Sequence, residues 1–257
     1  MRRLIALTVV AVAAALAYSV LSNVKQTIIL TAAKAVSVHG QPGQLRVVLS
    51  IDNKGAPDRL IGAQSDAGKT ATIINPEGEM AIVIPGADSA VLDADGVHII
   101  LQDLDPEYGV GALFPITLEF EGAGKVTTRA LHAPMDAMDH GAMMMDEVRG
   151  LTGPAPVLAF SPDIMPAADG FEADLSVKNM TLLQTPDGTA HVPGEGHAHL
   201  YLNGLKLGRL FKPVASVGSL MPGDYVLRVT LNSNDHRPYS TQDGPVGDTI
   251  RFQVEAR

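Results

Sequence analysis

The 257-residue sequence contains no cysteine. This absence excludes disulfides, thiolate metal sites and cysteine nucleophiles, and it leaves no cysteine for a lipid anchor of the bacterial lipoprotein type. Any chemistry with a soft metal must therefore use methionine and histidine. Positive charge is also scarce, with 19 lysine and arginine residues against 28 aspartate and glutamate residues. No basic run of the kind that tracks phosphates appears, so we expect no nucleic acid partner.

The N-terminus, "MRRLIALTVVAVAAALAYSVLSNVKQ", has the layout of a secretory signal. Two arginines precede an apolar stretch, and Ala15 and Ala17 supply an A-x-A-like cleavage site. The apolar character approaches the length of about 20 residues that a membrane span needs, so an uncleaved anchor is the alternative. We predict that residues 1–22 form a signal helix, cleaved or retained as a membrane anchor. The rest of the chain is then exported to the periplasm.

Helical periodicity is hard to find after this segment. Short runs alternate apolar and polar residues between clusters of Gly, Pro and Asp, among them "LRVVLSIDN", "SAVLDADGVHIILQDL", "FPITLEFEG" and "DYVLRVTLNSN". This pattern predicts an all-β fold. We predict two β-sandwich domains, cupredoxin-like or immunoglobulin-like, at residues 23–131 and 154–257. A Met/His-rich linker at 132–153 joins them.

Four segments of the first half carry a family resemblance. In order, "SIDNKGAPDRLIGAQS", "IVIP", "DGVHIILQDL" and "FPITLEFEGAGKVT" resemble the periplasmic copper chaperones of the PCu(A)C type, over about residues 36–130. The resemblance implies a cupredoxin-like β-sandwich that holds Cu(I) with two His and two Met.

The copper motif of that family is degenerate in this sequence. His98 stands where the resemblance places the His of a His-x-Met pair, but Ile100 occupies the Met position. The other His position falls near Ile73 and the other Met position near Pro76, with Met80 close by but out of register. One ligand of four survives, so His98 is the only candidate ligand that the resemblance supplies.

The predicted linker contains "HAPMDAMDHGAMMMDE", with five of the ten methionines of the chain. Cu(I) is a soft ion that takes thioether sulfur and imidazole nitrogen readily. Asp and Gly within the segment disfavour a stable helix whose methionines would share one face. The alternative is a linker that is Met-rich by chance, or whose methionines pack on a domain. The candidate Cu(I) ligands are His132, Met135, Met138, His140, Met143, Met144 and Met145.

A second cluster of histidines lies in "HVPGEGHAHLYLNG". His197 and His199 are two residues apart in a predicted strand, so both imidazoles project from one face, about 6–7 Å apart at Cα. His236, in "NSNDHRPY", follows another predicted strand, and sandwich loops at one end cluster together. His236 is then a third nitrogen ligand and His191 a fourth. Imidazole ligands suit Cu(II), Zn or Ni; the alternative is that the histidines pack or lie on the surface.

Enzymatic activity is not expected. No Ser-His-Asp order, nucleophile elbow or glycine-rich phosphate loop appears in its required context. An H-x-H strand also occurs in copper-zinc superoxide dismutases, but those enzymes need a larger histidine set and a disulfide. The second half instead resembles small exported β-sandwich domains found beside copper proteins.

The sequence therefore predicts an exported, non-enzymatic copper-binding protein or metallochaperone of the bacterial envelope. Cu(I) would use the linker thioethers and His98, and Cu(II) the histidines of the second domain. The expected partners are the copper ion and a recipient envelope cuproenzyme such as an oxidase, with membrane contact only through an uncleaved N-terminal segment. The alternative is an envelope scaffold or protein-interaction module that binds no metal.

Overall fold

The computed structural model describes residues 27–134, 154–186, 188–241 and 244–256, and these residues are nearly all in strands and turns. The one helical element in those ranges is a short 3₁₀ turn, η1 (Pro106–Tyr108). The predicted all-β fold class is therefore confirmed. No helix in the described part of the chain is long and apolar enough to cross a membrane. The predicted signal segment lies outside the described residues.

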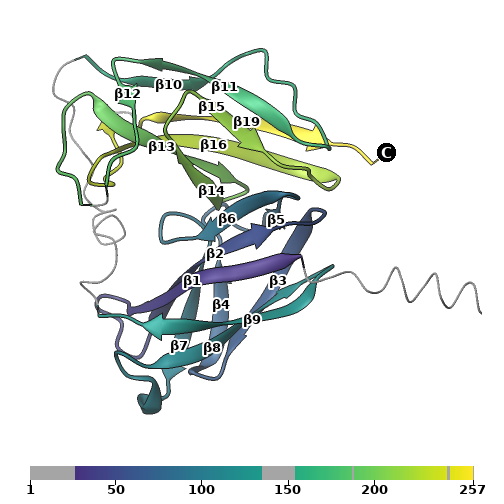
Figure 1. The fold of residues 1–257 in the computed structure, drawn as a ribbon, viewed down its shortest axis with the longest axis vertical. Coiled ribbons are helices and arrows are strands. Elements are labelled where there is room, and N and C mark those ends of the chain that lie inside the picture. Colours follow the sequence, from purple (N-terminus) through teal and green to yellow (C-terminus); the bar gives the residue numbers. More distant parts are fainter. Residues whose placement is uncertain (1–26, 135–153, 187, 242–243, 257) are drawn as a thin grey trace, which may run out of the picture.

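The first sandwich contains the strands up to residue 132 (Figure 1). They are β1 (Ile28–Ser37), β2 (Leu45–Asn53), β3 (Asp58–Ser65), β4 (Gly68–Ile74), β5 (Ile82–Ile84), β6 (Asp88–Leu92), β7 (His98–Leu104), β8 (Leu113–Phe120) and β9 (Gly124–His132). The run "SAVLDADGVHIILQDL" thus forms two strands, β6 and β7, separated by a turn at 93–97.

These strands form one coiled sheet in the order β4-β7-β2-β1-β9-β8-β3-β5, with β6 on the second half of β2. A register shift between Thr31 and Lys34 interrupts the pairing of β1 with β2. Such irregularities bend a strand, which lets a sheet close on itself. The sheet encloses a core that includes Ile51, Phe114 and Phe120. The alternation seen in the sequence, for example along β2, places every second side chain in this core.

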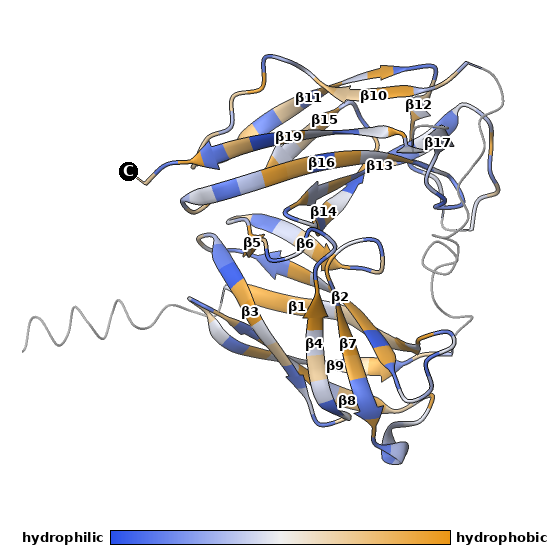
Figure 2. Cartoon of the chain, turned by 180° about the vertical axis from the view of Figure 1, so that it is seen from behind, coloured by the Kyte–Doolittle hydropathy of each residue, from blue (hydrophilic) through white to orange (hydrophobic). Residues whose placement is uncertain are grey.

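The second sandwich contains the strands from residue 157 onward. They are β10 (Val157–Phe160), β11 (Phe171–Lys178), β12 (Thr181–Leu182), β13 (Glu195–Leu202), β14 (Leu205–Leu210), β15 (Val214–Val217), β16 (Gly223–Ser233), β17 (Ser240–Thr241), β18 (Gly244–Pro245) and β19 (Gly247–Val254). One layer is β19-β16-β13-β14, and the other is β10-β11-β15. Their facing side chains, including Leu158, Leu200 and Tyr225, form a second core. Figure 2 shows apolar and polar segments along the strands of both sandwiches.

The two sandwiches meet along β6 and β14, where Lys206 pairs with Val91 (Figure 1). Leu205 of β14 lies in the core of the first sandwich, and Val83 of β5 lies in the core of the second. The two cores therefore interlock at this junction, because each contains a side chain from the other sandwich. This arrangement determines which segment of the first sandwich lies next to β13.

Candidate metal centre

The candidate centre begins with β13, a strand that is buried on both faces. Ala198 and Leu200 face the core of the second sandwich. His197 and His199 project from the opposite face, where each is only 3% exposed. The period of two along a strand puts these imidazoles side by side, as the H-x-H spacing predicts.

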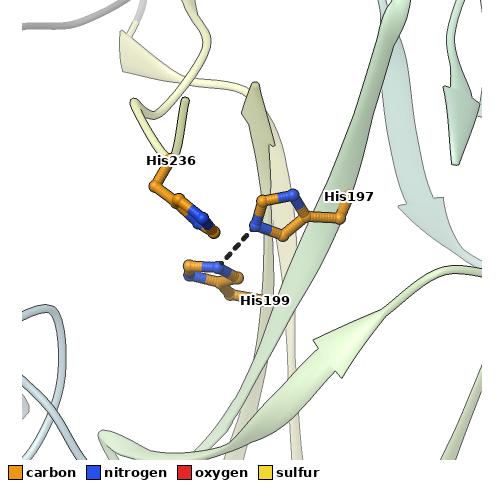
Figure 3. Close-up of side chains that lie close together, drawn as sticks. All are labelled: His197, His199 and His236. Atoms are coloured by element: carbon orange, nitrogen blue, oxygen red, sulfur yellow. Dashed lines mark hydrogen bonds between the residues drawn. The ribbon is translucent and has the colours of Figure 1, made fainter. Parts of the chain in front are cut away.

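Three imidazoles converge at this face (Figure 3). The Nε2 atoms of His197 and His199 are 3.0 Å apart. The ring of His236 lies 4.9 Å from the ring of His197, centroid to centroid. One ring nitrogen from each residue lies within 4.8 Å of the other two. The structure thus brings together three of the four histidines that the sequence singled out in this half.

His236 reaches the cluster from the turn that follows β16. Its backbone is in the left-handed region, with φ 64°, which is uncommon for a residue other than glycine. Its amide donates to the Ser233 carbonyl at 2.9 Å, and the Asn232 side chain donates to the His236 carbonyl at 3.4 Å. Since Asn232 is paired with His197 across β13 and β16, the same strand register positions both histidines.

Behind His199 lies a carboxylate that the sequence analysis missed. Asp95 Oδ2 accepts hydrogen bonds from His199 Nδ1 at 2.7 Å, from Tyr201 Oη at 2.8 Å and from Lys206 Nζ at 2.9 Å. Asp95 belongs to the turn between β6 and β7 of the first sandwich. Lys206 also bonds Asp93 of the same turn, at 2.8 Å. The acid-rich "DADG" was the only sequence signal for this turn, and nothing in it pointed to a histidine.

The surroundings keep both strand histidines neutral. Burial, together with the neighbouring imidazoles of His199 and His236, lowers the pKa of His197 to about 2. Burial and the Lys206 charge lower the pKa of His199 to about 4, against the opposing effect of Asp95. Burial would raise the pKa of Asp95, but the His199 hydrogen bond and the Lys206 charge outweigh it and hold that pKa well below its usual range. Neutral imidazole is the form that binds a metal.

The hydrogen bonds also define which nitrogen of His199 is available. An ionised carboxylate only accepts, so His199 Nδ1 carries the proton and Nε2 carries the lone pair. In the 3.0 Å contact, His197 Nε2 is then the donor. Two nitrogens bound tetrahedrally to one ion at about 2.0–2.1 Å lie about 3.3–3.4 Å apart. The observed separation is within a few tenths of an ångström of that value, so the two Nε2 atoms fit a shared ion once the His197 proton has moved from Nε2 to Nδ1.

The other predicted histidine ligands lie elsewhere. His191 is directed at Tyr239, whose hydroxyl is 3.4 Å from its Nδ1, and it is not in the three-histidine group. His132, predicted at the start of the linker, is the last residue of β9. It is buried there, with Nδ1 2.8 Å from the Tyr108 carbonyl oxygen.

His98 is half-buried in β7, with Nδ1 3.0 Å from the Gly96 carbonyl oxygen, and burial lowers its pKa. Across β4, Ile74 is paired with His98 and Thr72 with Ile100. These pairs share a face, so no second nitrogen or sulfur ligand faces His98 from β4. The remaining linker residues, Met135, Met138, His140, Met143, Met144 and Met145, lie outside the described residues.

The comparisons with known proteins concern the first half of the chain. Residues 23–132 match the family described as "LpqE-like: Putative lipoprotein LpqE-like". The N-terminal part of the chain is therefore similar to the LpqE-like family, and a further all-β part follows it. No curated protein matches the sequence.

Similar solved structures include PCuAC domains. The copper-bound PCuAC domain from PmoF2 is 26% identical, with 42% of this chain and 93% of that chain covered and a TM-score of 0.38. The apo PCuAC domain from PmoF1 is 24% identical, with 42% and 95% covered and a TM-score of 0.38. CuI-DR1885 from Deinococcus radiodurans is 22% identical, with 41% and 76% covered and a TM-score of 0.35.

Proposed function

We propose that this protein is an exported, non-enzymatic copper-binding protein of the bacterial envelope, and that His197, His199 and His236 bind the ion. The observation that carries the proposal is the convergence of three ring nitrogens within 4.8 Å, two of them on buried, neutral imidazoles. A buried pair of neutral imidazoles beside a third imidazole is an arrangement that metal ligation accounts for directly.

Copper is the preferred ion for two reasons. Nitrogen ligands bind Cu(II) more tightly than the other divalent first-row metals, Zn(II) included. The sequence resemblance of residues 36–130 to the PCu(A)C chaperones indicates the same cargo. The first sandwich retains only His98 of that family's ligand set. We therefore assign metal binding to the second sandwich. The ion is then cargo, captured from the envelope or delivered to a recipient cuproenzyme.

The experiment is a Cu(II) titration of the mature chain against a competing chelator, with Zn(II) in a parallel series. We expect one tight Cu(II) site. The substitutions His197→Ala and His199→Ala should each weaken it by more than about 100-fold, beyond the 10–100-fold that residues behind a ligand contribute. His39→Ala is the matched control, because His39 is exposed in a turn far along the chain from the cluster.

Two outcomes would count against the proposal. Equal affinity in the His197, His199 and His39 variants would mean that copper binds elsewhere and that the three imidazoles pack as a hydrogen-bonded group. Tighter binding of Zn(II) than of Cu(II) would support a metal centre at these histidines, but it would mean that the bound ion is zinc and not copper.

A further inference from the structure

The buried carboxylate of Asp95 connects the two sandwiches at the candidate metal centre. Its side chain is 7% exposed, and it comes from the first sandwich. All three donors to its Oδ2, from His199, Tyr201 and Lys206, belong to β13 and β14 of the second sandwich. The Tyr201 hydroxyl of the second sandwich also lies 3.2 Å from His199 Nδ1, but it is a neutral group that itself donates to Asp95, so the carboxylate comes from the first sandwich alone among these contacts.

The turn that carries Asp95 is held firmly against the second sandwich. The Val97 amide donates to the Gly204 carbonyl at 3.0 Å. A Cβ atom at Gly96 would lie 2.7 Å from that same oxygen, so only glycine permits this approach. Lys206, 5% exposed, forms ion pairs with both Asp93 and Asp95 and offsets part of their charge. These contacts fix Asp95 in place relative to β13.

The position of Asp95 has a direct consequence for metal binding. A carboxylate that accepts from the non-ligating nitrogen of a histidine fixes its tautomer and ring orientation and raises its basicity as a ligand. Asp95 does this for His199: its hydrogen bond holds the proton on Nδ1 and leaves the Nε2 lone pair directed at His197. The other oxygen, Oδ1, is buried without a hydrogen-bond partner among the described residues.

We infer that the metal centre is composite: the second sandwich supplies the ligands, and the first supplies Asp95 as the positioning residue for His199. The inference rests on the proposed function. Metal binding and the docking of the two sandwiches are then coupled, and the coupling is reciprocal. An ion on His199 strengthens the contact with Asp95, and a docked first sandwich strengthens the site. The first sandwich, degenerate at its own copper motif, thereby contributes to copper binding by the second.

The test compares Asp95→Asn with Asp93→Asn in the full mature chain. Both substitutions remove one negative charge from the same turn beside Lys206, but only Asp95 touches His199. We expect Asp95→Asn to weaken Cu(II) binding about 10–100-fold, and Asp93→Asn to change it less than about threefold. Pulsed electron paramagnetic resonance on the Cu(II) protein should show an altered remote-nitrogen signal of a bound imidazole in Asp95→Asn only. A merely structural contact would not move that signal.

The thermal midpoint of unfolding, Tm, reports metal binding in a way that does not depend on how much stability each substitution costs. Within each variant, the rise in Tm on adding Cu(II) is compared with the metal-free protein, and we expect a smaller rise for Asp95→Asn than for Asp93→Asn. If the Asp95 and Asp93 variants match in affinity, remote-nitrogen signal and Tm rise while His199→Ala abolishes binding, the inference is overturned and the proposed function stands. If His199→Ala binds Cu(II) like the parent, the proposed function fails and this inference fails with it.

Discussion

At the scale of single residues, the centre depends on which imidazoles stay neutral. The sequence placed His197 and His199 on one face of a strand, since that follows from a period of two. It did not reveal how far their pKa values are lowered, because burial and the Lys206 charge arise only when distant segments pack. Asp95 is 104 residues from His199 along the chain, and no local pattern connects them.

The lowered pKa of His199 makes the stability of the metal-free protein depend on pH. This pKa is about 4 in the folded protein, against 6.5 for an unperturbed histidine, so the unfolded state binds the extra proton between those values. Stability is therefore fully present above pH 6.5 and is lost as the pH falls toward 4. By linkage, His199 accounts for a loss of about 2 kcal/mol between about pH 7.5 and pH 5.

Urea unfolding at these two pH values checks this prediction. His199→Asn retains a donor near the Nδ1 position but does not titrate, so its loss should be smaller than that of the parent by about 2 kcal/mol. His39→Asn is the control, because it also replaces a histidine by asparagine but at an exposed position outside the cluster. A His199→Asn variant with the parent's pH dependence would contradict the neutral, buried state of His199.

At the scale of elements, the position of β13 depends on its close approach to β16 at Gly196. A Cβ atom at Gly196 would overlap the Asn232 carbonyl oxygen of β16, so the two strands approach closely just before His197. We expect Gly196→Ala to lower the free energy of unfolding by about 1–3 kcal/mol, as overpacking typically does, and to weaken Cu(II) binding through the shift of His197. Gly109→Ala is the control, because nothing lies within 4 Å of its added Cβ. Equal stability of the two variants in chemical unfolding would refute this role of the glycine.

Cu(I) binding by the methionines of the linker is a separate prediction at this scale. Replacing Met135, Met138, Met143, Met144 and Met145 together with Leu keeps apolar bulk and removes the sulfur donors. Because Cu(I) favours thioether ligands, its affinity, measured against a Cu(I)-specific chelator, should fall sharply, while Cu(II) binding at the histidines is unchanged. Unaltered Cu(I) affinity would mean that these methionines are not Cu(I) ligands and would favour the alternative that they pack on a domain.

At the scale of the whole molecule, the sequence predicted two β-sandwiches but not how they join. Alternating strands and the PCu(A)C resemblance indicated each fold locally, since both depend on short segments. The junction arises from β14 alongside β6 and from side chains such as Leu205 that enter the opposite core, which no periodicity encodes. The role of the acid turn between β6 and β7 is hidden in the sequence for the same reason, since its partners lie on β13 and β14.

Because each core contains a side chain from the other sandwich, a substitution in one sandwich should also destabilise the other. Leu205 is fully buried in the first core although it belongs to β14 of the second sandwich. Leu205→Ala should lower the free energy of unfolding by about 2–5 kcal/mol, the range for a cavity left by a buried leucine. Val157→Ala, at an exposed position of β10, is the control and should stay within about 0.5 kcal/mol of the parent. A small effect of Leu205→Ala in chemical unfolding would contradict the interlocked arrangement.

The most direct test of the central claim is X-ray absorption at the copper edge on the full chain loaded with one equivalent of Cu(II). We predict a first shell of nitrogen and oxygen at about 2.0 Å, with the outer-shell pattern of three imidazoles from His197, His199 and His236. His199→Ala should remove one imidazole from that pattern, and His39→Ala should leave it unchanged. A spectrum with no more than one imidazole, or one that is the same in the parent and His199→Ala, would contradict a copper centre at these three histidines.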